Sequence, residues 1–86
     1  MRIELRKFGK VLTSRQSGKE AFAAIRATLD PAAKVVEIDF DGIISLSPSW
    51  GDEFFSALRG MYGERLVYLQ SANSSVIATL KILADQ

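Results

Sequence analysis

The side chains best suited to a functional role lie together at the start of a predicted helix, in the segment Ser47-Pro48-Ser49-Trp50-Gly51-Asp52-Glu53. A helix N-terminus presents unpaired backbone N–H groups and the positive end of the helix dipole, which together favour an added phosphate. A phosphate on Ser49 would bring about −1.5 to −2 charges to the surface, enough to switch a partner interface. Ser49 is therefore a candidate phospho-acceptor. The neighbouring side chains would contact the partner: Ser47, Trp50, Asp52 and Glu53.

The same residues have a purely structural interpretation, which we favour. Serine is a preferred N-cap residue, and Ser49 is followed three positions later by Asp52, close to the capping-box pattern. Alternatively, Ser47 is the cap and Pro48 takes the first helical position. Asp52 and Glu53 would lie in the first turn and compensate the helix dipole. They would repel a phosphate on Ser49 unless a cation lies nearby.

Arg15 stands at the predicted start of an earlier helix, where a cation opposes the helix dipole. The side chain therefore needs a carboxylate partner, either within the domain or on another protein. We expect an internal ion pair, with Asp52 or Glu53 as the partner.

The composition argues against catalysis. The chain has no His and no Cys, so it lacks the usual general base near neutral pH and the usual thiol nucleophile. Neither common Gly-rich phosphate loop is present. Asp39 and Asp41 flank the end of a strand, where an acidic metal pocket or a receiver-type phospho-acceptor site is conceivable. Turn chemistry explains them better, because no supporting Lys or Thr arrangement accompanies them. We expect no catalytic residue, no metal and no cofactor.

Charge and hydropathy exclude other kinds of partner. The formal net charge is +1 and the Lys and Arg residues are scattered, which does not predict a nucleic-acid interface. No apolar run approaches the roughly 18 residues of a membrane span. The segment 1–7 alternates in charge and lacks the apolar stretch of a signal peptide. We therefore expect a cytoplasmic protein with neither a membrane nor a nucleic-acid partner.

Periodicity predicts one α/β domain over residues 1–86. Four strands are predicted, at residues 3–5, 11–12, 34–40 and 66–69. Three helices are predicted, beginning at Ser14 or Ser17, at 47–49 and at 73–75. Because strands alternate with helices, we expect a mixed, mostly parallel sheet of about four strands. The apolar strand 34–40 should be central and covered on both faces, and residues 41–46 should form a loop or a short extension.

The apolar residues predict which helix faces point inward. Trp50 belongs to the apolar stripe of the second helix, so it is more typical of a core than of a ligand platform. If that helix were half exposed, Trp50 would instead suit a partner surface. The inward face of the last helix is predicted to contain Val76, Ile77, Leu80 and Leu83. A self-association patch, and hence a homodimer, is conceivable around four residues: Phe55, Met61, Tyr62 and Ile82.

The segments Asp39-Phe40-Asp41-Gly42-Ile43 and 46–54 resemble the STAS-like domain family of unknown function. That family typically has an Asp-Phe-x-Gly-Val strand end, followed by Ser, an aromatic, a small residue and Asp-Glu. The upstream Phe8-Gly9 and Leu12-x-Ser14-Arg15 also fit, so the resemblance covers roughly residues 3–70. It implies a STAS-like fold.

The wider superfamily includes anti-sigma factor antagonists and the cytosolic domains of sulfate transporters. In the antagonists, an Asp-Ser-Ser-Gly segment carries a serine that a partner kinase phosphorylates, and Ser49 falls at that position. Ser47 stands where those proteins have Asp, and Trp50 where they have Gly. The resemblance implies a regulatory protein-binding module whose partner is a histidine-kinase-like ATPase or kinase.

Two other functions remain open. One is a structural subunit that acts through homo- or hetero-oligomerisation. The other is a small-molecule or nucleotide-binding domain, because functional groups gather beyond the carboxyl ends of parallel strands. The polar residues predicted at that edge include Asp41, Ser45, Ser71, Asn73 and Ser74.

Overall fold

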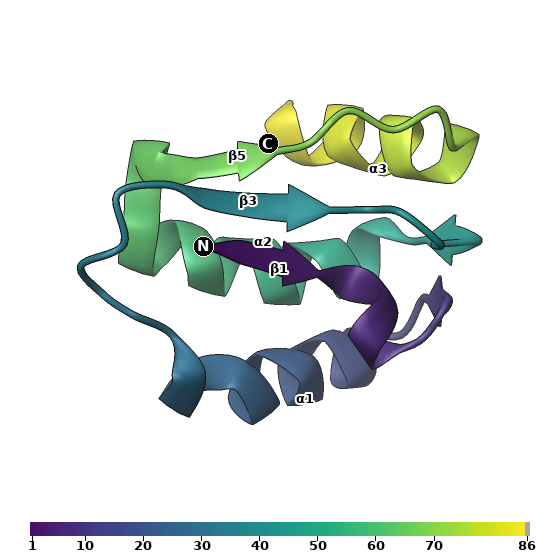
Figure 1. Cartoon of the computed structure of the whole chain (residues 1–86). Helices are drawn as coiled ribbons and strands as arrows, with labels where there is room; N and C mark the ends of the chain where they lie inside the picture. The colour runs from purple at the N-terminus through teal and green to yellow at the C-terminus, as the bar shows by residue number, and fades with distance from the viewer. Residues whose placement is uncertain (86) are drawn as a thin grey trace.

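The computed structural model describes residues 1–85 and forms a small α/β domain (Figure 1). Its strands are β1 (Arg2–Glu4), β2 (Val11–Leu12), β3 (Val36–Asp39), β4 (Ser45–Leu46) and β5 (Leu66–Tyr68). Its α-helices are α1 (Arg15–Ile25), α2 (Pro48–Tyr62) and α3 (Ser74–Ala84). Three short 3₁₀ turns complete the described chain: η1 (Leu5–Phe8), η2 (Arg26–Thr28) and η3 (Gly63–Arg65). The predicted α/β class and three helices are confirmed. None of the helices within residues 1–85 is long and apolar enough to span a membrane.

The five strands form two sheets, and every pairing is parallel. The larger sheet has the order β1-β3-β5, and the smaller one pairs β2 with β4. The predicted parallel pairing is confirmed, but the strands form two wholly parallel sheets instead of one mixed sheet of about four strands. After β1 the chain enters η1 and turns sharply at Gly9, whose φ of 124° lies in the region that favours glycine. This turn carries β2 away from β1, so β2 pairs with β4.

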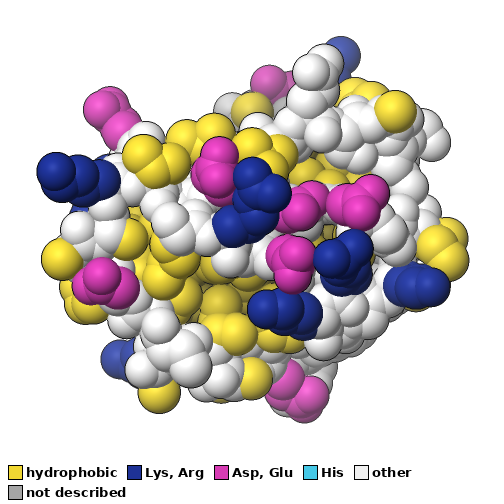
Figure 2. All heavy atoms as spheres, in the orientation of Figure 1, with side chains coloured by type: hydrophobic (Ala, Val, Ile, Leu, Met, Phe, Trp, Pro, Cys, Tyr) yellow, Lys and Arg dark blue, Asp and Glu magenta, His cyan; other side chains and the backbone are white. Residues whose placement is uncertain are grey.

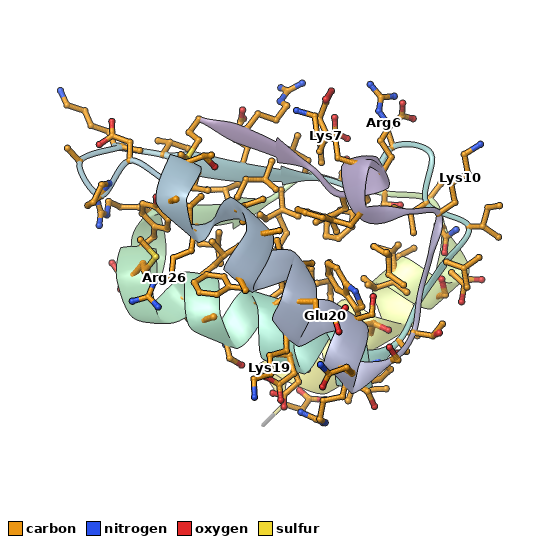
Figure 3. The ribbon with its side chains drawn as sticks, turned by 90° about the horizontal axis from the view of Figure 1, so that it is seen from below. Arg6, Lys7, Lys10, Lys19, Glu20 and Arg26 are labelled. Atoms are coloured by element: carbon orange, nitrogen blue, oxygen red, sulfur yellow. The ribbon has the colours of Figure 1, made fainter. Side chains whose placement is uncertain are left out.

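The larger sheet is covered on one face only. Figures 1 and 3 show α1 and α2 on the same side of the strands. The opposite face carries charged and apolar side chains that are exposed or half-buried, including Arg2, Glu37 and Val67. The predicted central position of β3 is confirmed, because β3 lies between β1 and β5. The predicted burial of both its faces is wrong.

The core is built around α2. Trp50 stacks on Phe54 with ring centroids 4.7 Å apart, and both side chains are fully buried. Helix α1 approaches α2 at Gly18, where a Cβ atom would lie 2.5 Å from the Trp50 carbonyl oxygen. Only glycine permits so close a contact between the helices. Phe55 and Tyr62 are also buried, so the conceivable self-association patch around them does not exist.

Helix α3 covers the free edge of β4. The Ser75 hydroxyl accepts a hydrogen bond from the Leu46 N–H, and the Thr79 hydroxyl donates to the Leu46 carbonyl at 2.7 Å. Residues 45–46 thus form a strand paired with β2. The sequence had predicted a loop or a short extension for residues 41–46. Because Thr79 turns inward, Ile77 turns outward and is 54% exposed. The prediction of Ile77 on the inward face was wrong, whereas Val76 and Leu83 are buried as predicted.

Candidate functional site

Ser47 caps helix α2. Its backbone is extended, with φ −103° and ψ 156°, and Pro48 takes the first helical position. The Ser47 hydroxyl accepts a hydrogen bond from the Trp50 N–H at 3.3 Å. The same hydroxyl donates to the Thr13 carbonyl at 2.5 Å, which ties the helix start to the segment after β2. Of the two interpretations of this segment, the one with Ser49 as the cap is wrong.

Ser49 occupies the second helical position and is half-buried. Among residues 1–85 its hydroxyl makes no side-chain hydrogen bond, in contrast to Ser47, which makes two. The capping requirement of the helix is already met, so the Ser49 hydroxyl has no structural task at the helix start. It therefore lies in the first turn of α2, outside the hydrogen bonds that cap the helix.

Arg15 joins the two helices through a shared ion pair. Its Nη1 donates to Asp52 Oδ2 at 2.9 Å and to Glu53 Oε1 at 3.0 Å. The internal ion pair expected for Arg15 is therefore present. The hydrogen bond from Arg15 holds the pKa of Asp52 below its usual range, and a bond from Ser56 acts in the same direction. The pKa of Arg15 is raised by its hydrogen bonds to Asp52 and then to Glu53.

The two carboxylates do not lie in the first turn of α2, contrary to the prediction. With Ser47 as the cap, Asp52 and Glu53 fall in the second turn, and the first turn holds no acidic residue. The dipole effect fades beyond the first turn, so these carboxylates are held by Arg15 and not by the dipole. They follow Ser49 by three and four residues, which places all three side chains on one side of the helix. We call Arg15, Ser47, Ser49, Asp52 and Glu53 the α2 N-terminal surface.

Trp50 does not belong to this surface. Its side chain is 0% exposed and packs among the rings of Phe8, Phe54 and Phe55. The prediction of Trp50 as a partner-binding residue was therefore wrong, because this face of α2 is buried in the core. Within residues 1–85 the indole Nε1 has no hydrogen-bond partner.

The carboxyl ends of β3 and β5 form a second, polar hollow of about 300 Å³. Most of its polar side chains form hydrogen bonds or ion pairs that fix the surrounding loops. Asp39 accepts a hydrogen bond from the Asp41 N–H, and Asp41 pairs with Arg6 at 3.3 Å. Asn73 caps α3 and donates to the carbonyls of Ile43 and Ile44. Residues 1–85 hold no group of three or more side chains arranged to bind a metal ion.

Two contacts at these sites were not predicted. The Thr13 carbonyl orients Ser47, but a backbone oxygen has no signature in the sequence. Arg6 bridges Glu4 and Asp41. Its only signal was opposite charge, and ten carboxylates in the chain offered that signal equally.

Comparison with known proteins gives the family. Neither the curated proteins nor the solved structures include a significant match to this chain. The profile of a family described as "STAS-like domain of unknown function (DUF4325)" matches residues 17–76. That range contains α2 with Ser47, Ser49, Asp52 and Glu53, and it begins two residues after Arg15. Because the match spans well over half of the sequence, the chain belongs to the family of STAS-like domains of unknown function.

Proposed function

We propose that this protein is a non-enzymatic regulatory module that binds a partner protein through the α2 N-terminal surface, and that phosphorylation of Ser49 weakens the binding. The observation that carries the proposal is the free Ser49 hydroxyl, which lies one helical turn before the carboxylates that Arg15 holds. A hydroxyl with no structural task can be modified without loss of a helix cap.

Arg15 supplies the cation that a phosphate at this position requires. Two carboxylates alone would repel a phosphoserine, because the phosphate adds about −1.5 to −2 charges. The guanidinium group has five donors and binds phosphate in a two-pronged manner. A phosphate on Ser49 would therefore compete with Asp52 and Glu53 for Arg15. The net charge of this surface would change from −1, for one guanidinium and two carboxylates, to about −2.5 to −3.

The proposed partner follows from the family resemblance. Anti-sigma factor antagonists present a serine at the matching position to a kinase, so we propose a histidine-kinase-like ATPase or kinase as the partner. We place the protein in the cytoplasm, without a nucleic-acid or membrane partner. Support comes from the scattered positive charge and the net charge of +1.

The test is a capture experiment from native extract with the wild type, Ser49→Ala and Ser49→Asp side by side. The endogenous protein is analysed in parallel by intact mass. The proposal expects one partner to be retained by the wild type and Ser49→Ala and lost by Ser49→Asp, together with a phosphate-sized mass addition. An unmodified protein that holds the same partner in all three forms would remove the switch.

A second candidate function is that of a structural subunit. Helix α3 exposes Ile77 and Ile82, at 54% and 48% of their surfaces, on the side away from the core. Exposed large apolar side chains on one helix can mark an interaction surface. Sedimentation over a range of concentrations tests this function. Assembly that Ile77→Lys abolishes would support it, and a monomer at all concentrations would exclude self-association.

A further inference from the structure

We draw no further inference here: the strongest candidate, the uncovered outer face of the β1-β3-β5 sheet with the apolar groove beside the free edge of β1 (Figure 2), has cations that already pair with carboxylates of the same face, and nothing among residues 1–85 shows what covers it.

Discussion

Arg15 Nη1 donates to Asp52 Oδ2 at 2.9 Å across 37 residues of sequence, and this bond joins the first turn of α1 to the second turn of α2. Arg15 is the first residue of α1, where its charge opposes the helix dipole. The pairing offsets that opposition and fixes the α2 N-terminal surface.

The pKa of Asp52 reports this pairing directly. Arg15→Met should raise the pKa of Asp52 from its lowered value towards the ordinary value for an aspartate, because the hydrogen bond from Arg15 is the main cause of the lowering. A lowered pKa means that the pair stabilises the fold above the ordinary aspartate pKa. This stabilisation is lost as the pH falls through the lowered value. A ¹³C titration of the Asp52 carboxyl measures the shift. Lys19→Met is the control, and an unchanged pKa in Arg15→Met would contradict the pairing.

Ser47 and Ser49 should differ sharply in their contribution to stability. Ser47→Ala removes the acceptor of the cap hydrogen bond from the Trp50 N–H and the donor of the bond to the Thr13 carbonyl. The expected loss is about 0.5–2 kcal/mol of unfolding free energy. Ser49→Ala removes no side-chain hydrogen bond of the described chain and should be close to neutral. Urea unfolding of both variants measures the difference, and an equal or larger loss in Ser49→Ala would reverse the cap assignment.

Two glycines within helices should respond to alanine with opposite signs. Gly18→Ala would place a Cβ 2.5 Å from the Trp50 carbonyl oxygen, and the forced separation of α1 from α2 should cost about 1–3 kcal/mol. At Gly60 nothing lies within 4 Å of the added Cβ. Gly60→Ala should therefore stabilise the protein by about 0.5–1 kcal/mol through helix propensity. Thermal unfolding compares them, and stabilisation by Gly18→Ala would refute the close helix contact.

The single tryptophan gives a direct test of the core. Trp50 is fully buried, so acrylamide should quench its fluorescence weakly in the folded protein and strongly in urea. The contrast should persist in Ser49→Asp, because Ser49 lies outside the buried core. Strong quenching in the native state would restore Trp50 as a candidate for the partner surface.

Local sequence patterns predicted the helices well because their signals are local. The buried stripe of the second helix with Trp50 and the start of the last helix within residues 73–75 appear in the structure as predicted. Strand pairing is not local. Nothing in residues 11–12 indicates that they pair with residues 45–46, because the turn at Gly9 and the loop after β3 decide that pairing together.

The errors at the candidate site share the same cause. Ser47 and Ser49 have equal cap propensities, and the choice between them depends on the Thr13 carbonyl, 34 residues away. The outward turn of Ile77 depends on the hydrogen bond from Thr79 to Leu46. The ion pair of Arg15 was predictable because a cation at a helix start opposes the helix dipole and therefore needs a carboxylate partner, even one distant in sequence.

The most direct test of the proposed function measures the affinity of the captured partner for the chain with phosphoserine installed at position 49. Isothermal titration compares this form with the unmodified chain and with Arg15→Met as a control for the ion pair. The proposal predicts that the phosphate weakens binding by about tenfold or more, as expected when charge is added to an interface. Equal affinity of the phosphorylated and unmodified chains would contradict it.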